Sequence, residues 1–348
     1  MKVNYLKLNS FRNYLLAETE FARGINFVFG ENGAGKTSLV ESLSLLSLGK
    51  SFRGSDDEEL IREGDDYAVI KANVENVGEY LISISKQGKN ITLNNQKVKK
   101  ISDIISACRL VYFLPKESEL FHMTPDKRRR FLDLSLSTLS HSYIEEIGKY
   151  RYYLKALKDN YKFHDEDYQN IVISKLAEYG NSVSQKRKKI INRLNQELQE
   201  IAQILLGDAK LQLSYLADIN SENVDDYQKK LKDSLVYKDD KLAVRGIHLD
   251  DMQLTYDGRD AGKYASQGQN RLGVIALKLA MAQLIKKSYG QDPLLIFDDV
   301  LSELDSEHKK RLLTILKNYE QVFITGVTCK ESDVARYQVQ DNQVRRII

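Results

Sequence analysis

The sequence predicts an α/β fold that combines an α/β core, an antiparallel β lobe and an inserted helical arm. The apolar run Ile25–Phe29 leads directly into a glycine-rich loop, and apolar side chains at helical spacing follow that loop. Between Tyr67 and Ile84, apolar residues alternate with other residues, which is typical of antiparallel strands. No proline lies between Pro125 and Pro293, and such an interval is compatible with long helices.

The N-terminal part of the core, with the β lobe, is expected to occupy residues 1–125. Its predicted core elements are three short strands and a helix, at Val3–Leu8, Leu15–Phe21, Ile25–Phe29 and Thr37–Leu48. The β lobe is predicted to contain the strand Tyr67–Val74 and a second strand around Ile82 and Ile84, joined by a turn at Asn76–Gly78.

Residues 126–240 are expected to form the inserted arm. Two long helical segments are predicted, at about Asp126–Lys162 and Tyr168–Leu206, with the polar connection His164–Asp167 between them. At about 1.5 Å per residue the second segment is roughly 55–60 Å long, which exceeds the usual helix of a compact domain. A short helix at Val224–Ser234 follows, and the C-terminal part of the core is expected to occupy residues 241–348.

Composition limits the functional classes. The chain has 348 residues, 42% of them hydrophobic, and a net charge of only +3. It therefore can bury a sizeable core, and bulk charge does not indicate a nucleic-acid binder. No segment approaches about 18 apolar residues, the length expected of a membrane span. The N-terminus lacks an apolar signal core, so we expect a cytoplasmic protein without a membrane partner.

Basic clusters are the candidate DNA contacts, because phosphate binding needs Lys and Arg gathered on one face. Three such clusters stand out: Lys97, Lys99 and Lys100; Lys127, Arg128, Arg129 and Arg130; and Lys186, Arg187, Lys188 and Lys189. The last cluster spans one helical turn, so its charges point in several directions and a solvated helix face is an equal alternative. Part of the second cluster is expected to pack or to pair with acids, since Phe131 follows it.

The glycine-rich loop matches the pattern G-x-x-x-x-G-K-[ST] in full, at Gly30, Glu31, Asn32, Gly33, Ala34, Gly35, Lys36 and Thr37. Its glycines allow backbone N–H groups to turn inward onto nucleotide phosphates. Lys36 is expected to reach the β- and γ-phosphate oxygens, which makes it a catalytic candidate, and the Thr37 hydroxyl to ligate Mg²⁺. The preceding apolar strand and the following helix are the context that this motif requires.

A second motif supplies acids. The apolar run Leu294–Phe297 ends in Asp298 and Asp299, as a buried parallel strand does when it delivers carboxylates at the ligand-binding edge of a sheet. Asp298 is the candidate Mg²⁺ partner, and Asp299 is the candidate that polarises the attacking water. For either residue the alternative is a cap of the following turn. Asp305 is a candidate nucleotide contact, a candidate N-cap for a helix at 306–317, or both.

The third motif comprises Ser266, Gln267, Gly268 and Gln269, at the start of a helix predicted at Asn270–Ile285. Ser266 and Gln269 fit S-x-x-Q, a capping box. A helix N-terminus with a hydroxyl and a glycine is also an anion site. The position of this motif, about 30 residues before the acidic strand, favours a role at a nucleotide over a cap alone.

Together these motifs resemble the ATP-binding-cassette ATPases of the chromosome-maintenance and repair type. More narrowly, nearly the whole chain resembles the RecF family of bacterial recombination mediators, through the segments Ser10–Tyr14, GENGAGKTSLVESL, KRRRFLD at Lys127–Asp133, SQGQ-N-R and DDVLSELD. The resemblance implies an ATP-binding-cassette type head that closes on ATP and Mg²⁺ as a head-to-tail homodimer, in which each SQGQ faces the γ-phosphate bound by the partner. It also implies that Arg12 lies near the nucleotide.

The resemblance further implies binding to double-stranded DNA and to gaps or single/double-strand junctions, weak DNA-stimulated ATP hydrolysis as a release timer, and a role in the DNA-damage (SOS) response. The implied protein partners are RecR and RecO, with RecA loaded indirectly. Two segments depart from the family pattern. The usual G-P-H-R-D-D reads GIHLDD at Gly246–Asp251, and a run of threonines is interrupted at Thr325–Thr328.

Two other classes remain open. A cassette ATPase that serves a transporter or the ribosome would share the nucleotide motifs, although the arm and KRRRFLD count against it. An ATP-gated nuclease would need an added acidic metal site, for which Asp239/Asp240 and Asp250/Asp251 are the spare pairs.

Overall fold

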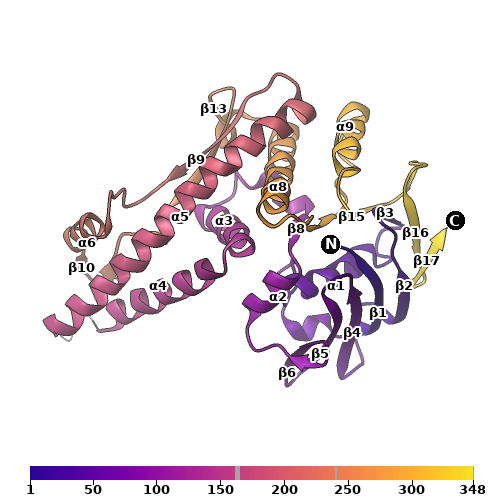
Figure 1. The fold of residues 1–348 in the computed structure, drawn as a ribbon, viewed down its shortest axis with the longest axis horizontal. Coiled ribbons are helices and arrows are strands. Elements are labelled where there is room, and N and C mark those ends of the chain that lie inside the picture. The colour runs from indigo at the N-terminus through magenta and orange to yellow at the C-terminus, as the bar shows by residue number, and fades with distance from the viewer. Residues whose placement is uncertain (161–164, 240, 348) are drawn as a thin grey trace. The chain divides into compact units, whose positions relative to one another are not determined.

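The computed structural model describes residues 1–160, 165–239 and 241–347, which form two compact units (Figure 1). The first unit contains residues 1–118, 204–206 and 281–348, and the second contains residues 119–203 and 207–280. Within the described ranges, every helix is too short or too polar to span a lipid bilayer.

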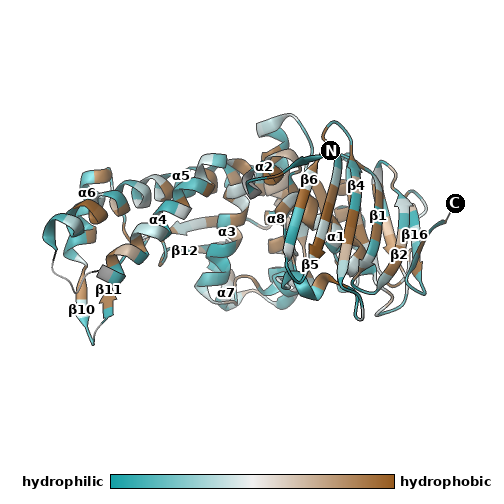
Figure 2. Cartoon of the chain, turned by 90° about the horizontal axis from the view of Figure 1, so that it is seen from below, coloured by the Kyte–Doolittle hydropathy of each residue, from teal (hydrophilic) through white to brown (hydrophobic). Residues whose placement is uncertain are grey.

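An antiparallel sheet forms the β lobe of the first unit. Its strand order is β2-β1-β4-β5-β6-β7, with bounds Tyr14–Glu20, Val3–Phe11, Tyr67–Val74, Gly78–Ser85, Gly88–Leu93 and Gln96–Lys97. Alternate residues of β4 face inward, with Ala68, Ile70, Ala72 and Val74 all buried. The predicted strand and its alternation are therefore confirmed, and in Figure 2 brown, hydrophobic residues occur along the ribbons of β4 and β5.

A mixed sheet forms the other layer of the first unit. Its order is β17-β16-β3-β15-β14-β8, with bounds Gln343–Ile347, Ala335–Gln340, Gly24–Phe29, Gln321–Gly326, Leu294–Phe297 and Leu110–Phe113. All neighbours pair in parallel except the edge strand β17. Because β3, β15 and β14 are adjacent and parallel, their carboxyl ends meet at one edge of the sheet.

Helix α1 (Lys36–Leu48) is built into the core of the first unit, and every residue from Leu39 to Leu48 is buried. One apolar cluster joins α1 to both sheets, through side chains such as Leu43, Ile82 and Phe323. The remaining elements of this unit are η1 (Asp57–Leu60), α2 (Ile101–Ala107), η2 (Pro115–Glu119) and α9 (Ser306–Leu316). This packing fixes the position of α1 and of the loop that precedes it.

The second unit is the arm. Helix α5 (Glu166–Leu206) has 41 residues, so it is about 60 Å long and confirms the predicted long helix. Helix α4 (His141–Asn160) lies beside it (Figure 1), and Lys186 of α5 pairs with Glu146 of α4 at 2.7 Å. The other elements are α3 (Pro125–Leu139), β9 (Leu211–Leu216), α6 (Val224–Asp233), β10 (Val236–Lys238), β11 (Lys241–Ala243), β12 (Asp251–Tyr256), β13 (Arg259–Asp260), α7 (Ala261–Tyr264) and α8 (Gln267–Tyr289). Helix α8 belongs to this unit as far as Ala280, and its last turns belong to the first unit.

Two predictions about the arm require correction. The single helix predicted from Asp126 is divided into α3 and α4, because Ser140 adopts an extended conformation, with φ −152° and ψ 112°. A serine hydroxyl at a helix end competes for backbone groups and favours such a break; here it bonds the Ser142 hydroxyl at 3.1 Å. The predicted connection His164–Asp167 lies in part outside the described residues, which resume at Asp165, the N-cap of α5.

The arm also extends further than predicted. The second boundary, expected between residues 240 and 241, lies at Ala280. The reason is strand pairing: β12 pairs antiparallel with β9 from Asp251↔Leu216 to Tyr256↔Leu211. Strands on both sides of the expected boundary therefore belong to one sheet, and the SQGQ motif belongs to the second unit.

Candidate nucleotide-binding site

The phosphate loop connects β3 to α1 at the carboxyl edge of the mixed sheet. Gly35 is the N-cap of α1, with φ +109°, and a Cβ there would lie 2.5 Å from Asn13 Nδ2 and 2.9 Å from the Tyr14 hydroxyl. Only glycine suits this position. The first turn of α1 carries no acidic residue and no side-chain cap. The N-terminal N–H groups of the helix thus remain available to an anion.

Lys36 lies on the inner side of this loop. Its Nζ donates to the carbonyl oxygens of Gly30 at 2.7 Å and Glu31 at 2.8 Å. Burial lowers the pKa of Lys36, and the nearby carboxylates of Asp299 and Asp298 oppose that shift. The structure thus brings together the ammonium group and both acids that the sequence predicted for the site.

Asp298 follows the last residue of β14 and is buried. Both of its carboxylate oxygens lie within reach of the Thr37 hydroxyl, at 3.0 and 3.2 Å, and the Thr325 hydroxyl donates to Oδ1 at 2.6 Å. Burial raises the pKa of Asp298, and the hydroxyls of Thr325 and Thr37 counteract part of the shift. A threonine hydroxyl next to a carboxylate offers the hard oxygen ligands that Mg²⁺ prefers, so the predicted pair fits the ion.

Asp299 occupies the next position and has a left-handed backbone, with φ +47°. Its N–H donates to Thr325 Oγ1 at 2.9 Å, so one threonine contacts the backbone of Asp299 and the carboxylate of Asp298. In the sequence, Thr325 stands out only as part of an interrupted threonine run. The signal that could have identified it is its place at the carboxyl end of β15, between β14 and β3.

A cavity of about 820 Å³ opens over these groups. All of its lining residues belong to the first unit: Arg12, Asn13, Asn32, Gly33, Gly35, Lys36, Thr37, Ser38, Arg53, Glu59, Ile61, Arg62, Glu63, Asp298, Asp299, Thr325 and Val327. Most of the predicted phosphate-loop residues are thereby placed at one surface with Arg12 and both acids. The segment 53–63, which carries no sequence motif predicted for the site, supplies another part of the lining.

The SQGQ motif starts α8 as the capping box that the sequence predicted. The Gln269 N–H donates to Ser266 Oγ at 3.2 Å, and the Ser266 N–H donates to Gln269 Oε1 at 2.9 Å. Ser266, Gln267, Gly268 and Gln269 are all exposed. The cap and a role toward an anion remain compatible, because an exposed helix N-terminus keeps further N–H groups available.

Asp305 caps helix α9. It accepts from the N–H groups of Glu307 at 3.0 Å and His308 at 2.9 Å. These bonds, with the His308 side chain, lower the pKa of Asp305. The capping alternative is therefore correct, and a nucleotide contact by this residue stays a prediction.

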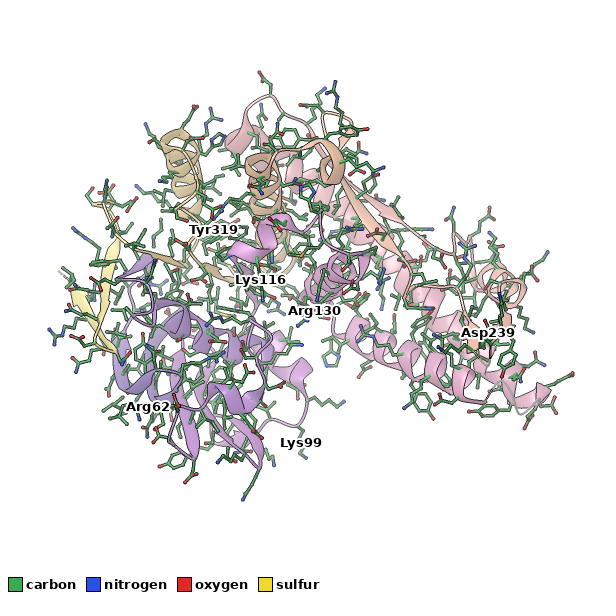
Figure 3. The ribbon with its side chains drawn as sticks, turned by 180° about the vertical axis from the view of Figure 1, so that it is seen from behind. Arg62, Lys99, Lys116, Arg130, Asp239 and Tyr319 are labelled. Atoms are coloured by element: carbon green, nitrogen blue, oxygen red, sulfur yellow. The ribbon has the colours of Figure 1, made fainter. Side chains whose placement is uncertain are left out.

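The KRRRFLD motif is largely occupied with structural contacts. The Arg128 guanidinium donates two hydrogen bonds to the Asp251 carboxylate, at 2.7 and 2.6 Å. Arg129 donates to the Asp250 backbone carbonyl at 2.8 Å. The motif thus fastens α3 to the loop that departs from the family pattern. Lys127 and Arg130 remain exposed, and Figure 3 shows Arg130 on α3.

The prediction that Arg187, in the third basic cluster, is a candidate DNA contact is wrong. Its side chain is 2% exposed and donates to Asp133 at 2.7 Å, Asp250 at 2.7 Å and the Ile247 carbonyl at 2.7 Å. It therefore cannot contact DNA. In the first cluster, by contrast, Lys97, Lys99 and Lys100 are all exposed, and Lys99 projects outward in Figure 3.

One of the acidic pairs considered for a nuclease, Asp250/Asp251, is already engaged by arginines. Asp250 and Asp251 are bonded to Arg187 and Arg128, and Asp239 lies at the β10–β11 turn (Figure 3). Asp240 lies outside the described residues. Across the described ranges, no group of three or more His, Cys, Asp or Glu side chains is arranged to hold a metal ion.

Comparison with known proteins agrees with this geometry. The family model for the RecF/RecN/SMC N terminal domain matches residues 2–345. The DNA replication and repair protein RecF of Agathobacter rectalis is 36% identical over 351 residues, covering 97% of this chain and 96% of the relative. The protein of the same name from Bacillus subtilis is 34% identical and covers 93% of each chain.

Solved structures give the same result. The recombination mediator protein RecF of the RecFOR pathway, as RecF-ATP, matches with a TM-score of 0.90 at 27% identity, covering 99% of this chain and 97% of that one. An Smc head domain from Pyrococcus furiosus matches in fold alone, with a TM-score of 0.57 at 15% identity over 99% of this chain and 95% of that one. The predicted ATP-binding-cassette type head, with its β lobe and inserted arm, is confirmed, and the chain belongs to the RecF family.

Proposed function

We propose that this chain is an ATP-dependent recombination mediator that closes as a homodimer on ATP and binds double-stranded or gapped DNA. The observation that carries the proposal is the convergence of Lys36, Thr37 and Asp298 at one sheet edge, with the Thr37 hydroxyl 3.0 Å from Asp298 Oδ1. Relatives named as DNA replication and repair proteins support the biological role. By the same argument RecR and RecO are the expected partners, and loading of RecA and SOS induction are the expected outcomes.

The residues divide the chemistry of ATP hydrolysis among them. Lys36 and the N–H groups of the loop hold the phosphates, and Thr37 and Asp298 would hold Mg²⁺, which neutralises charge that develops on the β- and γ-phosphates. In this proposal, Asp299 orients and polarises the attacking water. An aspartate reaches less far than a glutamate, which is consistent with slow hydrolysis that acts as a timer rather than as a power source.

The SQGQ motif provides the dimer interface. Its exposed N-terminus at α8 is suited to the γ-phosphate bound by a second copy, through the remaining N–H groups and the Ser266 hydroxyl. ATP would then act as the bridge between two subunits, because each nucleotide completes its shell of donors only in the closed dimer.

DNA contact is assigned to exposed lysines and arginines. The remaining candidates are Lys97, Lys99, Lys100, Lys127, Arg130 and Lys189, all exposed. Such contacts read the phosphate backbone, so we expect recognition of DNA shape and junctions, with strong salt dependence. The alternative of a transporter or ribosome ATPase shares the nucleotide site, but the relatives reported above favour DNA repair.

Lys36→Ala tests the ATP gate. In the wild type, ATP and Mg²⁺ are expected to raise the affinity for gapped DNA at least about tenfold, a coupling of about 1.4 kcal/mol. Lys36→Ala removes the ammonium group proposed to bind the nucleotide phosphates. It is expected to abolish this gain in DNA affinity, while the affinity without ATP stays unchanged. Fluorescence anisotropy with and without ATP measures both quantities. Lys86→Ala, an exposed lysine between β5 and β6, is the control. A gain retained in Lys36→Ala, or lacking in the wild type, would contradict the gate.

A further inference from the structure

Glu41 is a buried acid that the nucleotide chemistry described above does not use. It lies on α1, five residues after Lys36, and its side chain is 0% exposed. All other residues from Leu39 to Leu48 of this helix are leucine, valine or serine. A carboxylate buried in such surroundings is costly unless it is paired and hydrogen-bonded, so its partners indicate its role.

Those partners all come from the lining of the nucleotide cavity or from the segment beside it. Arg12 binds both carboxylate oxygens of Glu41, with Nε–Oε2 at 3.0 Å and Nη2–Oε1 at 2.8 Å. The Ser51 hydroxyl also donates to Oε1. Arg53 lies further away, with Nη1 at 3.8 Å from Oε2. A bidentate pair of this kind fixes the orientation of the guanidinium as well as its position.

Arg12 also donates hydrogen bonds to the segment 51–63, so its fixed orientation restrains that segment. Its Nη1 donates to the Glu59 carbonyl at 2.7 Å, its Nη2 to the Ser55 hydroxyl at 2.6 Å, and its backbone N–H to the Leu60 carbonyl at 2.8 Å. Within the described structure, its side chain therefore uses four N–H···O bonds. A guanidinium has five N–H donors, so one Nη1 N–H takes part in none of these four bonds.

We infer that Glu41 is a positioning residue for the nucleotide site: through Arg12 it holds the wall formed by residues 51–63 against helix α1. The wall contributes Arg53, Glu59, Ile61, Arg62 and Glu63 to the cavity. Glu41 thereby sets the spacing between this wall and the phosphate loop at the start of the same helix. This inference rests on the proposed binding of ATP. It predicts that loss of the Glu41 carboxylate weakens nucleotide binding, whereas the change in charge alone would strengthen it.

Electrostatics and positioning give opposite predictions for Glu41→Gln. Removal of a negative charge beside two arginines leaves the cavity more positive, and by charge alone an anionic nucleotide would bind more tightly. Positioning predicts weaker binding, because a glutamine cannot accept from Arg12 at both terminal atoms. The sign of the change in ATP affinity therefore distinguishes the two roles.

The test measures the Kd of a fluorescent ATP analogue and the steady-state KM and kcat of full-length variants. Glu41→Gln is expected to raise Kd and KM about tenfold with kcat changed less than about threefold, the pattern of lost uniform binding. Glu41→Asp, which keeps both oxygens, is expected to recover part of the affinity. Glu58→Gln, an exposed acid in the same segment outside the cavity, is expected to match the wild type.

A second readout does not depend on nucleotide. Arg53 and Arg62 are half-exposed trypsin sites in the wall, and their cleavage is expected to accelerate in Glu41→Gln, while cleavage at Lys86 is unchanged. In an Arg12→Ala background, Glu41→Gln is expected to add little to the loss of affinity. Unchanged or tighter ATP binding by Glu41→Gln, or a fall in kcat alone, would overturn the inference. A wild type that binds no ATP would instead refute the proposed function.

Discussion

Asp298→Asn is expected to make the protein more stable and nearly inactive. The substitution removes the carboxylate that would hold Mg²⁺, so the rate of ATP hydrolysis should fall about 100-fold or more. This fall corresponds to an increase of at least about 2.7 kcal/mol in the activation free energy. It also removes a buried charge, and the fold should gain roughly 0.5–2 kcal/mol, the range common for stabilising substitutions. Steady-state ATPase assays and thermal unfolding without nucleotide measure the two effects.

The sign of the stability effect follows from the pKa. Burial raises the pKa of Asp298 in the folded protein, so the folded chain takes up this proton at a higher pH than the unfolded chain does. The charged group therefore destabilises the fold at neutral pH, and this penalty is relieved as pH falls through the raised folded pKa. Binding of Mg²⁺–ATP should weaken over the same interval, because the ion needs the carboxylate.

Asp341→Asn is the matched control, since Asp341 is exposed in the β16–β17 turn and its left-handed backbone, with φ +51°, suits asparagine. Neither activity nor stability should change in this variant. If Asp298→Asn kept wild-type hydrolysis, Asp298 would have no role at the metal. If it lowered the melting temperature, the Thr37 and Thr325 hydroxyls would already compensate fully for its burial.

Arg187→Met should destabilise the arm severely. Arg187 bridges Asp133 of α3 and Asp250 of the loop before β12. Its removal leaves the buried Asp250 without this cation, whereas Asp133 keeps Arg151 at 3.1 Å. Breaking a buried ion pair by deletion of one partner costs about 3–5 kcal/mol. Urea unfolding monitored by circular dichroism should show this loss as an early transition of the second unit.

Lys189→Met provides the comparison, because Lys189 is exposed two residues further along the same helix. Its effect should stay within about 0.5 kcal/mol, as for ordinary surface substitutions. Equal stability of the two variants would show that Arg187 is solvated and available to DNA, contrary to its contacts in the structure.

The sequence predicted those parts of the molecule whose conformation depends on interactions between residues close together in the chain. The phosphate loop, the capping box at Ser266 and the long helix α5 follow from glycine spacing, hydroxyl chemistry and periodicity, which short windows contain. The pairing of β9 with β12 joins residues about 40 apart in the chain, and no local pattern specifies it. For this reason the sequence placed the arm boundary at residue 240 rather than at Ala280.

The difference between local and long-range interactions also explains which residues of the nucleotide site the sequence predicted. Lys36, Thr37 and Asp298 belong to motifs with fixed spacing, whereas Thr325 joins them only because β15 lies beside β14. Glu41 and Arg12 are 29 residues apart, and their ion pair has no signature beyond an acid within an apolar helix. Arg187 shows the converse limit, because a run of basic residues gives no indication of which members the fold buries.

Closure of two subunits on ATP is the central claim, and analytical ultracentrifugation of Ser266→Arg tests it most directly. Wild-type protein with ATP and Mg²⁺ should sediment as a dimer. Ser266→Arg should bind ATP with wild-type affinity but remain a monomer, because the bulky side chain occupies the helix N-terminus offered to the partner. Ser288→Arg, near the C-terminal end of the same helix α8, should dimerise normally. A wild type that stays monomeric with saturating ATP, or a Ser266→Arg variant that dimerises as the wild type does, would contradict the account.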